Sequence, residues 1–310
     1  MMPRIPLFAC LLSLPLCCQS GGETVPVAAV VAITVPQVDW VSLRYEANKM
    51  GVTLSTTLDL AESSRREMQA PPYSALGNAA FQTAAADVIR LGIHAHAETA
   101  LSSYQTEGRI WFDPASGAVL QIDRLKPGTG GSRKIYRFAG DGVLRIRQEP
   151  AGRNEATQAP DSWTKIKRNF YPYAPIAAGC DVVTTPALLL YRASALDPAG
   201  GGKPQCVFFD DALYRVWLEP EGDALRPVDY AVKAGGATHK VSGNRRIQKV
   251  SLRVEPITPG ADPADFELLE LRGAIAIYLD AANRLPVQLT GERTGAGELV
   301  IGLVEAGLRD

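Results

Sequence analysis

The chain has 310 residues, of which 32 are basic and 33 acidic, and its formal net charge at pH 7 is −1. A balance this close to neutral gives no electrostatic basis for binding nucleic acid, so nucleic acid is not an expected partner. A chain of this length can bury a substantial core, and one extended domain is a simpler expectation than two closely joined halves.

The N-terminal segment has the features of a secretory signal peptide. Arg4 provides a short positive region, Leu7 to Leu16 is apolar, and small residues around Ser20 suit cleavage. The protein is therefore expected to be periplasmic or secreted, and loss of Arg4 leaves 31 basic and 33 acidic residues, a formal charge of −2. The sequence divides into a signal peptide at 1–20, a linker at 21–37 and a single β-rich domain at 38–310.

The cysteines fall into two groups with different expected roles. Cys17 and Cys18 follow the apolar run, so attachment of a lipid anchor to one of them is an alternative to cleavage and release. The residues before them are larger than those that usually precede a lipidated cysteine. Cys180 and Cys206 lie in the expected mature chain, where an oxidising compartment favours a disulfide over two buried free thiols. No later stretch reaches the ~18 to 20 apolar residues of a spanning helix, so the mature chain is expected to have no transmembrane span.

The first part of the expected domain has the period-2 alternation of antiparallel strands. Val38 to Leu60 predicts a hairpin that turns at Gly51, a residue that readily takes a positive φ. Ala61 to Ala86 loses this alternation and predicts a loop with at most one helical turn. Further strands of a meander are expected at Asp87–Glu98, Arg109–Phe112, Ala118–Leu125, Lys134–Phe138 and Val143–Gln148.

The region after the meander is irregular and then contains a helix. Thr185 as N-cap and Pro186 at the first helical position predict a short helix over Ala187–Ala195. Because its residues are apolar around much of the circumference, we expect it to plug the sheet. Strands are then expected at Gln205–Phe209, Leu213–Leu218, Val228–Lys233, Ile247–Val254, Leu268–Asp280, Leu285–Thr290 and Leu299–Glu305.

These elements predict a mainly all-β fold: a curved antiparallel sheet or open barrel with one or two short helices. Apolar and aromatic stripes on the strands would either pack solidly or leave an apolar pocket under the helix. The candidate ligand-binding residues are the aromatic side chains of these stripes, Phe112, Tyr136, Phe138 and Trp217.

A metal site is the alternative with the clearest residue pattern. His94, His96 and Glu98 alternate on one predicted strand, so they share a face and could hold zinc, with His239 as a further ligand. The same alternation is also expected for ordinary polar residues that face solvent on a strand whose other face is apolar. No Gly-x-Ser-x-Gly motif accompanies the histidines, so we predict no catalytic residues and no cofactor.

Small basic clusters are a further candidate for recognition. Lys165, Lys167 and Arg168 lie together near Trp163 and Phe170, and Arg245 adjoins Arg246; such groups could bind an anionic lipid head or a glycan, but a solvated surface is the more ordinary interpretation. The leading functional hypothesis is a non-enzymatic cell-envelope protein that binds an apolar or amphipathic ligand on its curved sheet, with a lipid or an envelope protein as partner. The alternatives are a structural or assembly factor of the envelope and a metal-dependent hydrolase.

The order of several turn motifs resembles an uncharacterised family of exported bacterial proteins known as a domain of unknown function. The residues that carry the resemblance are Leu43-Arg44-Tyr45-Glu46 with Met50-Gly51, Trp111-Phe112-Asp113-Pro114, Lys134 to Phe138 before Asp141-Gly142-Val143, and Ile275 to Asp280 with Arg284-Leu285-Pro286-Val287. The resemblance implies a curved antiparallel sheet, similar in outline to the open barrels of periplasmic lipoprotein carriers. It implies no catalytic residues.

Overall fold

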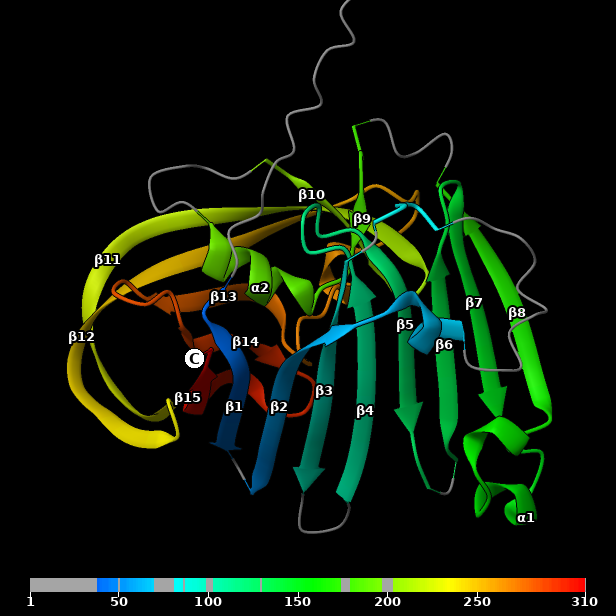
Figure 1. Cartoon of the computed structure of the whole chain (residues 1–310), viewed down its shortest axis with the longest axis horizontal. Coiled ribbons are helices and arrows are strands. Elements are labelled where there is room, and N and C mark those ends of the chain that lie inside the picture. The colour runs from blue at the N-terminus through cyan, green and yellow to red at the C-terminus, as the bar shows by residue number, and fades with distance from the viewer. Residues whose placement is uncertain are drawn as a thin grey trace, which may run out of the picture. The chain divides into compact units, whose positions relative to one another are not determined.

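The computed structural model describes residues 38–49, 51–69, 81–85, 87–98, 103–128, 130–173, 179–196 and 203–309. The expected signal peptide and linker lie outside these residues. The strands join in one sheet of fifteen, in which nearly every neighbouring pair is antiparallel (Figure 1). The structure thus confirms the predicted fold class, a curved antiparallel sheet with a few short helices.

The first eight strands form a meander in which each strand pairs with the next. Gly51, with a φ of +74°, makes the predicted tight turn of the first hairpin. Burial alternates along the strands, so that one face, here called the concave face, is apolar and turns toward the rest of the sheet, while the outer face is more polar. These strands are β1 (Trp40–Lys49), β2 (Val52–Ser63), β3 (Val88–Glu98), β4 (Ser103–Phe112), β5 (Val119–Lys126), β6 (Ser132–Phe138), β7 (Gly142–Glu149) and β8 (Lys165–Pro172).

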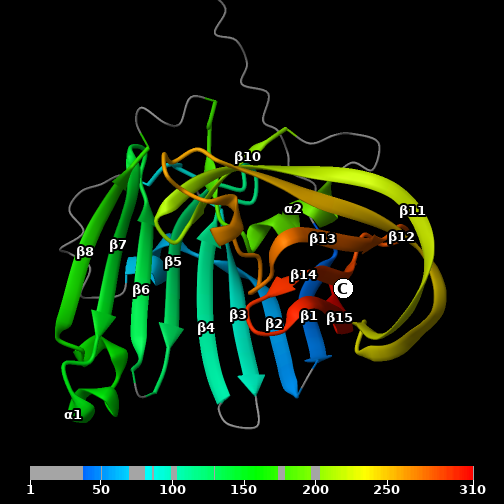
Figure 2. The ribbon, with the colours of Figure 1, turned by 180° about the vertical axis from the view of Figure 1, so that it is seen from behind.

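The remaining strands continue the sheet from β1 through the C-terminal strand. The pairings β11–β12, β12–β13, β13–β14, β14–β15 and β15–β11 close a ring of five strands, and β10 and β9 extend from β11 (Figure 2). These strands are β9 (Val183–Thr184), β10 (Gln205–Phe209), β11 (Ala212–Ala234), β12 (Ala237–Pro256), β13 (Arg272–Asp280), β14 (Pro286–Arg293) and β15 (Gly297–Leu308).

Two of the predicted strands, Leu213–Leu218 and Val228–Lys233, are parts of the single long strand β11. Its start pairs with β10, and its end lies parallel to β15 at Ala231–Lys233. A register shift between Pro220 and Asp223 interrupts the pairing with β12, and such irregularities bend strands. The bend lets one hairpin reach from one side of the sheet to the other.

The helix α2 (Leu188–Ala195) occupies the interior, as predicted. Leu188, Leu189, Leu190 and Tyr191 are all buried. Thr185 is not its N-cap, however: the helix begins three residues later, and no side-chain hydrogen bond caps it, because Thr185 is itself buried in a backbone turn that leads into the helix. At the other end, Arg284 donates to the carbonyls of Ala193 and Leu196, which satisfies the C-terminal backbone groups.

The other helices of the described residues are a turn or so long: η1 (Arg65–Gln69), α1 (Arg153–Ala156), η3 (Pro160–Ser162) and η4 (Pro263–Asp265). The first of these lies in the segment predicted to be a loop with one helical turn. Within the described part of the chain, no helix has the length and apolar character needed to cross a membrane.

The predicted disulfide is present, and two strands, β8 and the two-residue β9, were not predicted. Cys180 and Cys206 are bonded, with their Cα atoms 5.6 Å apart, and the bond ties the segment before β9 to β10. Strand β8 is at the edge of the sheet, where its side chains are largely exposed on both faces. It therefore lacks the alternation of apolar and polar residues that marks a half-buried strand.

Candidate functional site

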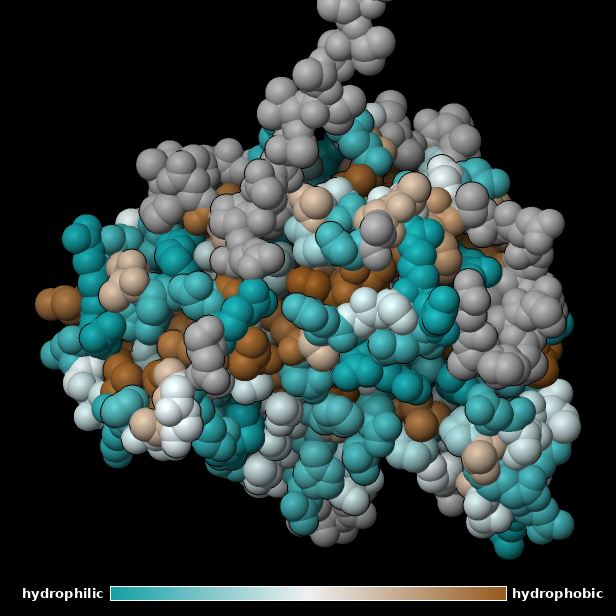
Figure 3. All heavy atoms as spheres, viewed as in Figure 1, coloured by the Kyte–Doolittle hydropathy of each residue, from teal (hydrophilic) through white to brown (hydrophobic). Residues whose placement is uncertain are grey.

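The candidate metal ligands lie on the outer face of the meander. His94, His96 and Glu98 are exposed along β3. The side of the molecule seen in Figure 3 carries many hydrophilic side chains, with apolar ones among them. His94 comes within 4.0 Å of Asp59 on β2, whereas His239 lies on β12, which does not pair with β3. Among the residues that the structure describes, no three His, Cys, Asp or Glu side chains are grouped to hold a metal ion.

The concave face contains a mainly apolar pocket of about 160 Å³, here called the inner pocket. Its floor is formed by β3 to β6, and its walls by the turn before α2, by β10 and by the segment before β13. The lining residues are Ile93, Ala95, Thr106, Gly108, Ile110, Ile122, Arg124, Tyr136, Thr185, Pro186, Ala187, Phe208, Phe209, Asp210, Glu267, Leu269 and Glu270. An apolar cavity of about 150 Å³ is enough to bind benzene, so the inner pocket can hold a ring or a short stretch of alkyl chain.

Small residues explain why space remains in this part of the sheet. Ala95 on β3 and Gly108 on β4 lie between larger side chains, and a Cβ at Gly108 would come within 3.5 Å of Ile93. Toward the other end of the same strands, Phe112 packs edge-on against Tyr191 of α2, with ring centres 5.3 Å apart. The helix therefore fills one end of the concave face and leaves the other open.

The structure places the four predicted ligand-binding aromatics in different surroundings. Tyr136 lines the inner pocket. Phe112 and Phe138 are fully buried core residues, and Phe138 packs against Phe208, which itself lines the pocket. Trp217 is half-buried on the opposite face of β11 from buried Val216 and Leu218, and Arg253 covers its ring at 3.5 Å.

A larger and more polar pocket of about 570 Å³, here called the outer pocket, adjoins the inner one. Arg124, Phe209, Asp210 and Glu267 line both pockets, so an apolar space opens directly onto a charged one. An elongated molecule with one apolar end and one polar end would match this arrangement.

Asp210 connects the β10–β11 turn to the meander. It accepts hydrogen bonds from Lys134, at 2.9 Å, and from the hydroxyl of Tyr136, at 3.2 Å, and Arg145 lies 3.7 Å away. Burial acts to raise the pKa of Asp210, but the hydrogen bond and charge of Lys134, with Arg145 and Tyr136, outweigh it and lower the pKa overall. Burial raises the pKa of Tyr136, and the charge of Asp210 adds to this effect.

On the opposite wall, a tight turn between Leu268 and Leu271 points into the inner pocket. These two buried residues exchange backbone hydrogen bonds, and the residues between them, Leu269 and Glu270, have φ values of +48° and +67°. Such values are unfavourable for residues other than glycine. Glu270 bonds to Tyr104 of β4, and burial, followed by this hydrogen bond, raises the pKa of Tyr104 to about 12.

The link at Asp210 gives a prediction about acid stability. Because its folded pKa is below the unfolded value of about 3.9, ionised Asp210 stabilises the fold above roughly pH 4, and this contribution is lost as pH falls through the lowered pKa. We expect Asp210→Asn to have a lower free energy of unfolding than the wild type at pH 6, measured by urea unfolding. The difference between the two proteins should narrow at pH 3. The side chain is 44% exposed, so the gap will be small. A gap of equal size at both pH values would contradict this assignment.

Most of the pocket residues were not predicted from the sequence. Ile93 and Ala95 were placed on the apolar face of their strand, but alternation does not distinguish a residue that lines a space from one that is packed. Leu269 and Glu270 lie within the span predicted as a continuous strand over Leu268–Asp280, whereas β13 begins only at Arg272. The two positive φ values form a turn without Gly or Asn, so no turn signal was present.

The fold and the pocket together define a class: a mainly antiparallel, curved-sheet protein with a helix in its interior and a half-apolar, half-charged pocket on its concave face. Comparison of the chain with protein-family models, curated proteins and solved structures finds no match. The family resemblance drawn from the turn motifs therefore remains an expectation.

Proposed function

We propose that the protein is a periplasmic or secreted, non-enzymatic binding protein that holds an apolar or amphipathic ligand on its concave face. The observation that carries this proposal is the inner pocket, with apolar side chains from β3, β4, β5 and β10 and an opening onto the charged outer pocket. The Cys180–Cys206 disulfide supports an oxidising compartment. The apolar space matches a ring or a short alkyl segment more closely than a complete long acyl chain.

Filling the inner pocket tests this proposal. Gly108 is suitable for substitution because the atoms nearest to an added Cβ belong to Ile93 and lie at ordinary contact distances, and because valine favours strands. A valine side chain takes the room of about two methylene groups, each worth ~0.8 kcal/mol when buried, so Gly108→Val should weaken binding of an alkyl ligand roughly tenfold. Octyl glucoside, measured by titration calorimetry below its micelle concentration, is the probe.

The matched control is Gly302→Val. Gly302 lies in β15, outside both pockets, and a Cβ there would meet nothing within 4 Å. We expect this variant to bind octyl glucoside as the wild type does. Wild-type protein that does not bind octyl glucoside, or equal binding by Gly108→Val, would refute the proposal.

A further inference from the structure

Four cations lie in one row across four neighbouring strands of the concave face. Arg124 of β5 is directly opposite Lys134 of β6, Lys134 is opposite Arg147 of β7, and Arg147 is opposite Lys167 of β8. Arg124 and Lys134 line the outer pocket, and directly paired residues project to the same side of a sheet. We call this row the basic ladder; Figure 2 looks onto the side of the sheet that carries it.

The basic ladder is an unfavourable arrangement for the protein alone, because like charges that are directly opposite on adjacent strands destabilise a sheet. Lys126, Arg145 and Lys165 also project from this face, next to the ladder. Two carboxylates form ion pairs with four of these seven cations. Asp210 pairs with Lys134 and Arg145, and Glu149 pairs with Arg147 and Lys165.

The ends of the basic ladder are open to an external anion. Among the described residues, no ion pair forms at Arg124, Lys126 or Lys167, all of which are exposed, and the Arg147 side chain is 45% exposed. Asp211, Asp265 and Glu267 lie on the facing wall of the outer pocket, and Glu267 is bonded to Arg272. The excess of positive charge is therefore local to β5–β8, in a chain whose overall charge is −1.

We propose that the basic ladder binds the phosphate head of an amphiphile whose apolar part enters the inner pocket. This inference rests on the proposed function and specifies the chemical class of the ligand. Neighbouring strands are about 4.8 Å apart, so two adjacent cations can contact different oxygens of one phosphate. Arginine adds paired donors that match the geometry of a phosphate. Arg124 lines both pockets and so marks the point where head and tail would meet.

Four probes measured by calorimetry at low salt test this inference: octyl phosphate, octyl glucoside, octyltrimethylammonium and inorganic phosphate. We expect octyl phosphate to bind at least tenfold more tightly than octyl glucoside and inorganic phosphate, and octyltrimethylammonium to bind most weakly of the alkyl probes. Added salt should weaken the binding of octyl phosphate and leave octyl glucoside nearly unchanged, because salt screens exposed charges.

Variants of the basic ladder provide the matched comparison. Arg124→Gln should weaken the binding of octyl phosphate about threefold to tenfold, because Arg124 lies where the head would sit. Lys167→Gln, which is outside both pockets, should weaken the binding of octyl phosphate about twofold and leave that of octyl glucoside unaffected. Arg168→Gln is the control, because Arg168 follows Lys167 in β8, is also exposed and projects to the opposite face. It should leave the binding of both probes unchanged.

The possible outcomes separate this inference from the proposed function. Equal affinity for octyl phosphate and octyl glucoside would overturn the role of the basic ladder and leave the pocket proposal standing. If inorganic phosphate binds as tightly as octyl phosphate, the basic ladder takes a free oxyanion and the amphiphile is refuted. If neither octyl phosphate nor octyl glucoside binds, both proposals fail.

Discussion

Replacing Tyr191 with alanine is expected to lower the free energy of unfolding by about 4 kcal/mol. The ring lies in the interior of the sheet, edge-on to Trp40 of β1 at 6.3 Å and to Phe112 of β4 at 5.3 Å. Through this one ring, α2 thus contacts both β1 and β4. The substitution opens a cavity and also removes two aromatic pairs, each worth about 0.5–1.5 kcal/mol beyond its buried area.

Tyr191→Phe is the control for this substitution, because it keeps the ring and removes only the hydroxyl. Urea unfolding followed by circular dichroism and by tryptophan fluorescence measures both variants. We expect Tyr191→Phe to stay within about 1 kcal/mol of the wild type, since the ring contacts carry the effect. A loss of less than 1 kcal/mol in Tyr191→Ala would show that α2 is not the packing element that the structure indicates.

The strands that could be predicted from the sequence are those with one buried and one solvated face. In β3, Leu91 and Ala97 are buried while His94 and His96 are exposed, so the sequence alternates in polarity along the strand. β8 has no such contrast, because it is an edge strand with both faces largely exposed. Alternation of apolar and polar residues predicts a strand only where one face of the strand is buried. It gives no signal where both faces are exposed.

The length of β11 could not be predicted because two prolines interrupt its pattern. Pro220 and Pro227 would each remove a hydrogen bond from a central strand. Between its pairings with β10 and with β15, however, β11 has one edge without a partner strand among the described residues. Proline is tolerated at such an edge, so the chain continues as one strand through residues that normally end one.

The basic ladder illustrates why a site can be absent from any sequence pattern. Its four residues are ten, thirteen and twenty positions apart, and they share a row only because the three hairpins of β5 to β8 have particular registers. Lys165, Lys167 and Arg168 were identified as one basic cluster from the sequence. The strand separates them, since Lys165 and Lys167 project to the concave face and Arg168 to the outer face. Arg245 and Arg246 are instead paired with Asp280 and Asp223.

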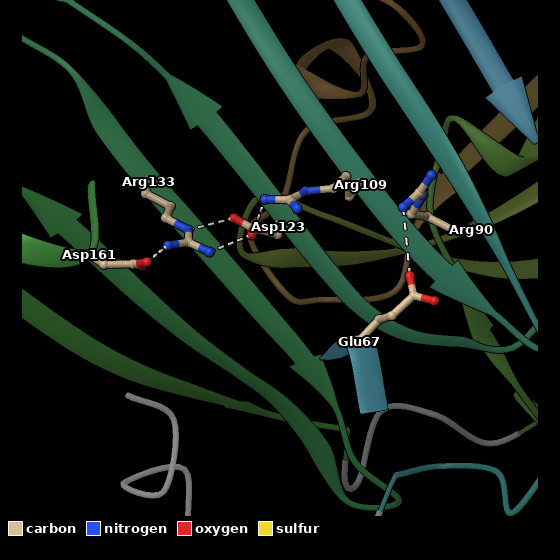
Figure 4. A network of polar contacts seen from close by, with 6 residues as sticks. All are labelled: Glu67, Arg90, Arg109, Asp123, Arg133 and Asp161. Carbon is tan, nitrogen blue, oxygen red and sulfur yellow. Dashed lines mark hydrogen bonds and ion pairs between the residues drawn. The ribbon is translucent and has the colours of Figure 1, made fainter. Parts of the chain in front are cut away.

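On the outer face of β4 to β6, by contrast, charges of alternating sign lie side by side (Figure 4). Asp123 of β5 accepts two hydrogen bonds from Arg133 of β6, at 2.8 and 2.6 Å, and lies 3.2 Å from Arg109 of β4. The side chains of Asp123 and Arg133 are 6% and 10% exposed, so this ion pair is mostly removed from water, whereas Asp161, the other carboxylate on Arg133, is 64% exposed.

Asp123→Ala is accordingly expected to lower the free energy of unfolding by about 3 kcal/mol, because the buried guanidinium of Arg133 loses its bidentate partner. Asp161→Ala removes a carboxylate from the same arginine at an exposed position, so it should cost less than about 1 kcal/mol. Urea unfolding at pH 7 of both variants makes the comparison direct. If the two variants lose equal free energy of unfolding, the buried ion pair of Arg133 with Asp123 stabilises the fold no more than the exposed pair with Asp161. Because both residues lie on the outer face, neither variant should change the binding of octyl phosphate by the folded protein.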